Sequence, residues 1–283
     1  MTAPSAPPFD PRSIRGVAFD GYGTLFDFGM PHFREQITAA LAEQQIEVDL
    51  DAFFETWQRS YRVADVWPPE EGDQPPAANP GAFSPPASEA AADIPPARRW
   101  PTERALNGPL PPWHSQWEIW RRQFGAALDA HHLDGDADAV ADRFREALSV
   151  APAYPEAHEA VEILATRGYV LGLLSNADED FLQGALSRAR LRFSVIQTSE
   201  SLRAYKPHRS IFVAIAERLG LQSHEVLYVG DSPYADVAGA RNAGMPVAWV
   251  RREETAFPEH LPAPDVTISA LTELADVLEG VPS

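Results

Sequence analysis

Val17-Ala18-Phe19-Asp20-Gly21-Tyr22-Gly23-Thr24-Leu25 is the stretch of sequence that decides the fold of this chain. Val17 to Phe19 form a short apolar run, which is typical of a buried strand, and the run ends at Asp20. The glycines at positions 21 and 23 permit a tight backbone path around that aspartate. An aspartate at a strand end can also serve only to start a turn, so this stretch alone does not define a functional site.

Four more apolar runs follow in the second half of the chain, at residues 170–174, 193–197, 226–229 and 247–250. Helical periodicity lies between them: Ala157, Val161 and Leu164 recur at helical spacing, and Gly168 ends that helix. This alternation predicts an α/β fold, a Rossmann-like three-layer core with a parallel sheet. Ligands bind at the carboxyl ends of such strands, so we expect the residues that follow the strands to converge.

The middle of the chain has a different pattern, helical and without repeats. Aromatic residues step by three or four positions along one predicted helix, at Trp113, Trp117, Trp120, Phe124 and Leu128. Such a stripe is most often plain core, and lining a ligand pocket is the less common alternative. We therefore expect an inserted α-helical cap domain at 31–151, a catalytic core at 15–30 and 152–283, and a flexible leader at 1–14.

The segment at about 67–112 is rich in Pro, Ala and Ser, with proline pairs at 75–76, 85–86 and 95–96. Proline excludes long helices and central strands here. We expect a Pro-rich loop within the cap. It is either a mobile linker or an extended loop held by Trp67 and Trp100.

Composition excludes several classes of function. The 283 residues are 45% hydrophobic, which suits one or two globular domains. With a net charge of -18 and 23 basic residues, we expect no nucleic-acid partner. The lack of cysteine excludes disulfides, thiol nucleophiles and zinc-thiolate sites. Without a secretion-signal pattern or an apolar run of about 20 residues, we expect a cytoplasmic protein and no membrane partner. The oligomeric state stays open.

Polar residues follow two of the other predicted strands, and a lysine precedes a predicted helix. Ser175 and Asn176 end the run at 170–174 and could donate hydrogen bonds to an oxyanion. Lys206, just before a predicted helix, is the only lysine in the chain. Lysine is a compact point charge, whereas arginine is a broad fork, so a site crowded with carboxylates can favour lysine. Asp231 and Asp236 follow the run at 226–229.

In order and spacing these segments resemble the four motifs of the haloacid dehalogenase-like (HAD) hydrolase superfamily. The matching residues are Asp20 and Thr24, then Ser175, then Lys206, then Asp231 and Asp236. The resemblance covers about residues 15–29 and 154 to the end, and the helical middle fits the place of that family's helical cap.

The resemblance implies that Asp20 is a nucleophile, which forms a covalent intermediate that water later hydrolyses. It implies that Ser175 and Lys206 steady the charge of that intermediate. It also implies a Mg²⁺ site made by Asp20, Asp231, nearby Asp236 and the backbone carbonyl of Tyr22.

The first motif departs from the phosphatases of this superfamily, which carry a second aspartate two residues after the nucleophile. This chain has Tyr22 there, as in the 2-haloacid dehalogenase branch, which needs no metal. That branch, however, typically has Ser and Asn in the last motif, where this chain has Gly230 and Asp231. Tyr22 either biases the enzyme toward phosphates with good leaving groups or only packs beneath the cap.

Electrostatics favours the phosphatase. Clustered acids with one lysine raise one another's pKa, and a divalent cation with oxygen ligands removes that penalty. We therefore expect Mg²⁺-dependent hydrolysis of a small, anionic phosphorylated metabolite. The alternative is a metal-independent 2-haloacid dehalogenase, which would need a cap arginine such as Arg34, Arg59 or Arg62. A further alternative is a binding or regulatory protein that kept the fold and lost turnover.

Overall fold

The computed structural model describes residues 9–61, 66–67 and 101–280. Its centre is a six-stranded, all-parallel sheet in the order β3-β2-β1-β4-β5-β6. The strands are β1 (Gly16–Phe19), β2 (Val170–Ser175), β3 (Val195–Thr198), β4 (Val226–Gly230), β5 (Val247–Val250) and β6 (Val266–Ile268). The order places β1, which leads to Asp20, between β2 and β4. The α/β, Rossmann-like prediction is thereby confirmed.

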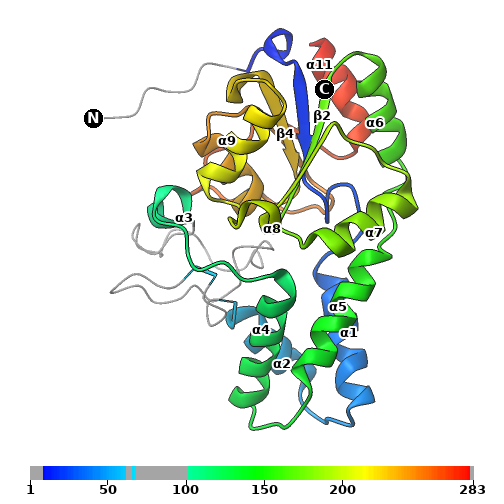
Figure 1. Ribbon diagram of the computed structural model, residues 1–283, viewed down its shortest axis with the longest axis vertical. Coiled ribbons are helices and arrows are strands. Elements are labelled where there is room, and N and C mark those ends of the chain that lie inside the picture. Colours follow the sequence, from blue (N-terminus) through cyan, green and yellow to red (C-terminus); the bar gives the residue numbers. More distant parts are fainter. Residues whose placement is uncertain (1–8, 62–65, 68–100, 281–283) are drawn as a thin grey trace.

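Helices cover both faces of the sheet, with α9 on one side and α6 and α11 on the other (Figure 1). The helices of this part are α6 (Ala157–Thr166), α7 (Glu179–Ala189), α8 (Ser199–Leu202), α9 (Arg209–Arg218), α10 (Ala238–Asn242) and α11 (Leu274–Glu279). Short 3-10 turns are η1 (Pro11–Ser13), η5 (Ser223–Glu225) and η7 (Leu271–Glu273), and η6 (Pro233–Val237) is a π-helical turn.

Successive side chains of β1 point to opposite faces of the sheet, so the strand contributes to the cores on both faces. Val17 and Phe19 point into the core shared with α6, α7 and α11, whereas Ala18 points into the core under α9 and α10. All four residues of β1 are fully buried, as expected for a central parallel strand covered on both faces.

Helices α1 (Met30–Glu43), α2 (Leu50–Arg59), α4 (Gln116–Ala130) and α5 (Ala137–Ser149) form a bundle below the sheet (Figure 1). The short α3 (Glu103–Asn107) lies beside α9. Asp49, Ser115 and Asp136 cap the N-termini of α2, α4 and α5 with their side chains. Phe33, Trp57, Trp120 and Phe144 pack edge-on or tilted in the bundle. This confirms the inserted helical cap. Each such buried aromatic side chain contributes on the order of 2–3 kcal/mol.

The expected strand at 193–197 is observed two residues later, and β6 was not expected. β6 has only three residues, so its pattern was too short to find. Within the Pro-rich segment, residues 68–100 lie outside the described residues, as do residues 1–8 of the expected leader. The boundaries 1–14, 15–30, 31–151 and 152–283 stay predictions.

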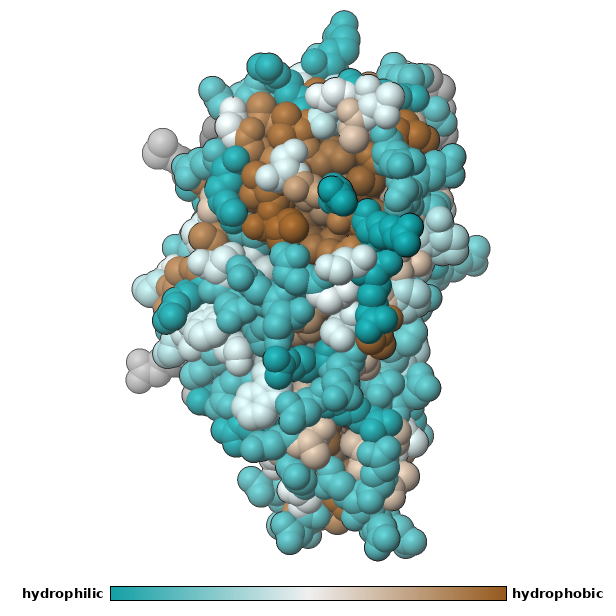
Figure 2. Space-filling model, turned by 45° about the vertical axis from the view of Figure 1, so that its right-hand side comes forward, coloured by the Kyte–Doolittle hydropathy of each residue, from teal (hydrophilic) through white to brown (hydrophobic). Residues whose placement is uncertain are grey.

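Polar side chains cover most of the cap, and apolar ones gather on the sheet-containing part in the same view (Figure 2). In the described residues, no helix is both long and apolar enough to span a bilayer.

Candidate active site

Asp20 follows β1 in a tight loop that its neighbours hold. The Asp20 N–H donates to the Val229 carbonyl at 2.8 Å, which continues the pairing of β1 with β4. The N–H groups of Leu25 and Phe26 both donate to the Gly21 carbonyl, at 2.7 and 3.0 Å. At Gly23 φ is +91°, and a Cβ there would meet the Asp231 carboxylate at 2.4 Å. Glycine is therefore required for the loop to pass this close to Asp231.

Lys206 brings its ammonium group to two carboxylates. Its Nζ lies 2.5 Å from Oδ1 of Asp20 and 2.7 Å from Oδ1 of Asp236, and the side chain is 3% exposed. It also donates to the Tyr228 hydroxyl at 3.2 Å. Charge-assisted hydrogen bonds at these distances are strong. The only lysine of the chain thus lies beside the expected nucleophile.

Asn176 holds the loop that carries Lys206. The Lys206 N–H donates to Oδ1 of Asn176 at 2.8 Å, and Nδ2 of Asn176 donates to the Lys206 carbonyl at 3.3 Å. The side chain is therefore engaged with backbone through its oxygen and one amide hydrogen, and donation of the second hydrogen to an oxyanion stays a prediction. Ser175 ends β2 against the nucleophile loop, where a Cβ on Gly21 would lie 2.9 Å from its Oγ.

The carboxylates influence one another. Burial raises the pKa of Asp20 to about 6, although Lys206 opposes the shift and Asp236 adds to it. Burial, followed by the charges of Asp20 and Asp236, raises the pKa of Asp231 well above its usual range. Thr24 donates its hydroxyl to Oδ1 of Asp231 at 3.4 Å. Burial alone would lower the pKa of Lys206, but the two carboxylates raise it, so the lysine stays charged.

Asp20, Asp231 and Asp236 can each bring one oxygen within 4.8 Å of the other two. Their existing contacts engage the three acids to different degrees. Asp236 uses Oδ1 for Lys206 and for the Tyr228 hydroxyl at 3.1 Å, and Oδ2 accepts from the Ser232 N–H at 3.0 Å. Asp20 already has the lysine as its counter-charge. Asp20, Asp231 and the Tyr22 carbonyl were the expected Mg²⁺ ligands, and Asp236 is the acid whose two oxygens are both engaged by these contacts.

Tyr22 packs beneath the cap, the second of the two roles considered for it. Its ring lies 5.4 Å from that of Phe26 and 5.8 Å from that of Phe181. Its hydroxyl donates to the Leu148 carbonyl at the end of α5, at 3.2 Å. Tyr22 therefore ties the nucleophile loop to the cap.

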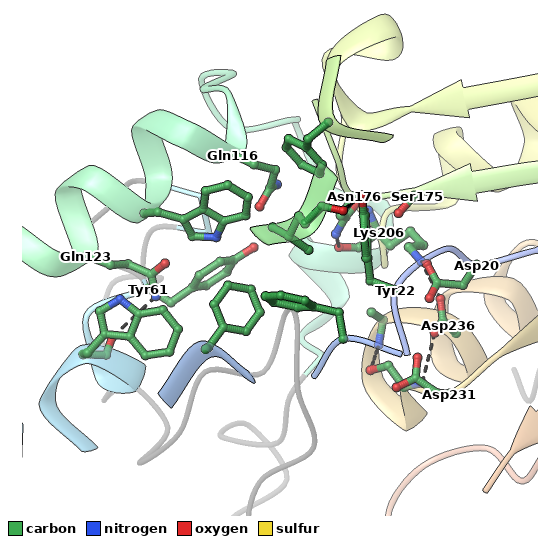
Figure 3. Close-up of a pocket in the computed structure, with 18 residues that line it drawn as sticks. Asp20, Tyr22, Tyr61, Gln116, Gln123, Ser175, Asn176, Lys206, Asp231 and Asp236 are labelled. Atoms are coloured by element: carbon green, nitrogen blue, oxygen red, sulfur yellow. Dashed lines mark hydrogen bonds and ion pairs between the residues drawn. The ribbon is translucent and has the colours of Figure 1, made fainter. Parts of the chain in front are cut away.

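A cavity opens between the sheet and the cap (Figure 3). Asp20, Ser175, Lys206, Asp231 and Asp236 line one part, together with Tyr22 and Asn176. The structure thus brings together the residues that the sequence singled out. The exception is Thr24, which contacts Asp231 but does not line the cavity.

Further aromatic and amide side chains line the cavity, one from the loop before α1 and the others from the cap. These are Phe28, Phe33, Trp57, Tyr61, Trp120, Gln116 and Gln123. From the sequence, a pocket-lining role was considered for only one of them, Trp120, as part of the aromatic stripe. The amides gave no signal, because glutamines on a predicted helix usually face solvent.

The cap arginines considered for binding a substrate carboxylate, Arg34 and Arg59, do not line the cavity. Arg34 pairs with Asp51, and Arg59 pairs with Glu55 on the exposed side of α2. Arg62 lies outside the described residues. Among the described residues that line the cavity, Lys206 is the single cation.

Comparison with known proteins defines the class. The family model for haloacid dehalogenase-like hydrolases matches residues 14–244. The chain therefore belongs to the haloacid dehalogenase-like hydrolase family, as the motifs indicated.

Two relatives and one solved structure show which members of the family this chain is similar to. (S)-2-haloacid dehalogenase 4A of Burkholderia cepacia is 30% identical over 165 residues, 57% of this chain and 70% of the relative. The (S)-2-haloacid dehalogenase of Pseudomonas sp. strain YL is 25% identical over 277 residues, 94% of this chain and 95% of the relative. The structure of L-2-haloacid dehalogenase from Xanthobacter autotrophicus is 21% identical, with a TM-score of 0.65 over 95% of this chain and 100% of that one.

These matches correct two expectations. The preference for a phosphatase is wrong, because both relatives are 2-haloacid dehalogenases and one of them matches over 94% of this chain. The expectation of Mg²⁺ is wrong for the same reason, since that branch of the family needs no metal. Lys206 contacts two of the three acids at once, so the protein itself supplies a counter-charge to Asp20 and Asp236.

Proposed function

We propose that this protein is a metal-independent (S)-2-haloacid dehalogenase, a hydrolase that converts 2-halo acids into 2-hydroxy acids. The observation that carries the proposal is the contact of Lys206 with both Asp20 and Asp236 inside the cavity. This ion pair keeps a buried carboxylate charged and available as a nucleophile without a cation. The match to a dehalogenase over 94% of the chain supports it independently.

The reaction proceeds in two displacements. A carboxylate oxygen of Asp20 attacks C2 of the substrate from the side opposite the halogen, and the carbon–halogen bond breaks with its electron pair leaving as halide. The Asp20 carboxyl is then an ester. Water attacks the ester carbonyl, the 2-hydroxy acid leaves, one proton is released, and the carboxylate is restored. Inversion at C2 gives the (R)-hydroxy acid.

The surroundings of Asp20 suit each step. Lys206 loses one of its two partner charges when the ester forms, and its ammonium is then placed to stabilise the oxyanion of ester hydrolysis. Ser175 lines the cavity at the next strand end, where its hydroxyl can donate to the substrate carboxylate. The aromatic cap walls exclude bulk water and so lower the competing solvation of the nucleophile.

An isotope experiment tests the proposal. With enzyme in excess over (S)-2-chloropropionate in H₂¹⁸O, the first turnover should place ¹⁸O in the Asp20 carboxyl and leave the lactate unlabelled. Asp20→Asn should abolish chloride release, whereas Asp276→Asn, the same change at an exposed residue of α11 outside the cavity lining, should retain it. Label in the first-turnover lactate would contradict an Asp20 ester. Absence of chloride with every 2-halo acid would reject the function itself.

A further inference from the structure

The cavity has two chemically different ends. The carboxylates and Lys206 lie at the sheet end, and Gln116, Gln123 and Tyr61 lie at the cap end (Figure 3). Displacement at C2 needs only the sheet end, because the substrate carboxylate is bonded directly to the carbon under attack. The proposed reaction therefore leaves the polar groups at the cap end without a role.

Two of the described lining residues keep a buried side-chain nitrogen that has no hydrogen-bond partner. They are Nε2 of Gln116 and Nε1 of Trp57. Gln116 is 7% exposed and Trp57 is fully buried. Leaving such a donor unpaired costs about 1–3 kcal/mol, so an orphaned donor beside a cavity indicates a group that arrives with the ligand. Both orphans are N–H donors, which means that the missing partner is an acceptor.

The position of Gln116 is fixed relative to the sheet. It is the first residue of α4, and its backbone N–H donates to Oδ1 of Asp178 at 2.8 Å. The next N–H, that of Trp117, donates to Oδ2 of Asp178 at 3.1 Å. Asp178 belongs to the loop after β2, the strand that delivers Ser175. The orphaned amide is thus held at a set distance from the nucleophile, as a specificity contact requires.

The acceptor should be uncharged. The single cation among the described lining residues, Lys206, is at the sheet end and already pairs with two carboxylates. A second carboxylate at the cap end would be buried against neutral donors only, which is far more costly than burying a carbonyl or ether oxygen. Other walls of the cavity are apolar and aromatic, with Phe28, Phe33 and Trp120 among them.

We propose that the cap end of the cavity is a recognition subsite in which Gln116 binds a neutral hydrogen-bond acceptor on the substrate. The substrates are then 2-halo acids with an aryl side chain that ends in such an acceptor. The aryl ring packs against the aromatic walls of the cavity, and a terminal carbonyl or ether oxygen meets Nε2 of Gln116. This substrate class rests on the proposed dehalogenase function, whereas the subsite itself can be tested by binding alone.

The binding test uses halogen-free ligands. 3-(4-Acetylphenyl)propanoate carries the acceptor, and 3-(4-isopropenylphenyl)propanoate has nearly the same shape without it. By isothermal titration, the wild-type protein should bind the acetyl ligand at least about tenfold more tightly, as expected for filling a buried, unpaired donor. In Gln116→Leu the ratio should fall to about one. Gln58→Leu, the same change on α2 outside the cavity lining, should keep the wild-type ratio.

The kinetic test repeats the comparison with the corresponding 2-chloro acids, measured as chloride release. The wild-type kcat/KM should favour the acetyl compound about tenfold, and Gln116→Leu should remove that preference. Circular dichroism and thermal melting establish that each variant is folded, and Gln116→Glu, which replaces the donor by an acceptor, offers a second variant of the same size.

The outcomes separate the two proposals. A ligand ratio near one in the wild type, or an unchanged ratio in both Gln116 variants, would show that water fills the cap end and would overturn the subsite. Discrimination in binding without chloride release from any 2-chloro acid would reject the dehalogenase function while the subsite stands. Chloride release from 2-chloropropionate, without a preference for the acetyl ligand over the isopropenyl ligand, would reject the subsite while the dehalogenase function stands.

Discussion

Acidification should switch the enzyme off near pH 6, because Asp20 must be ionised to attack carbon. Burial is the main cause that raises the pKa of Asp20 to about 6, with Lys206 opposing it. At pH 7 about ten elevenths of the nucleophile is then ionised, and at pH 5 about one eleventh. We therefore expect kcat/KM for (S)-2-chloropropionate to fall about tenfold between pH 7 and pH 5, with a slope approaching ten per pH unit below that.

Chloride release measured by an ion-selective electrode gives this profile directly, since the substrate stays ionised throughout the range. One other buried acid could imitate the result. Burial raises the pKa of Asp178 to about 6 as well, although the N–H groups of Gln116 and Trp117 partly offset the shift. Asp178→Asn removes that second titration, and the acid limb should persist in this variant. A rate that stays flat to pH 4.5 in the wild type would refute the reasoning about Asp20. Loss of the acid limb in Asp178→Asn would show that Asp178, and not Asp20, causes the limb.

Further changes probe the charges and contacts around the site. Lys206→Met leaves buried carboxylates unpaired, so we expect unfolding to become easier by about 3–5 kcal/mol in urea titrations and chloride release to fall at least about 100-fold. Asp231→Asn relieves like-charge crowding, so the melting temperature should rise and chloride release should persist in chelator; complete inactivity would restore the case for a cation at Asp231. Tyr22→Phe loses one hydrogen bond to Leu148, and we expect a loss of about 1 kcal/mol in stability with the pH profile unchanged. Since the folded-state pKa of Asp178 exceeds the unfolded value, this residue should lower stability by up to about 3 kcal/mol as pH rises from about 4 to 6, and Asp178→Asn should remove that contribution while those of Asp20 and Asp231 remain.

The sheet could be predicted from the sequence because its strands are short, continuous apolar runs that end in polar residues. The convergence of Asp20, Ser175, Lys206 and Asp231 followed from one rule, that parallel strands present their carboxyl ends at the same edge. β6 was missed because three residues at a sheet edge carry too little pattern.

The choice between the two chemistries could not be made from the sequence. Tyr22 in the first motif and Asp231 in the last point to different branches of the family, and the phosphatase was rejected by the match to a 2-haloacid dehalogenase over 94% of this chain. The role of Gln116 was hidden for a different reason. Its burial comes from the contact of α4 with Asp178, which lies 62 residues away in the chain. Tertiary contacts of this kind turn an ordinary helical glutamine into a cavity wall.

The most direct test of the central claim, that Lys206 takes the place of a metal ion at Asp20, is chloride release from (S)-2-chloropropionate after exhaustive treatment with EDTA. The account predicts the same rate with EDTA as with added Mg²⁺, and no phosphate release from an aryl phosphate under either condition. Phosphate release that requires Mg²⁺, with no chloride release in EDTA, would contradict it.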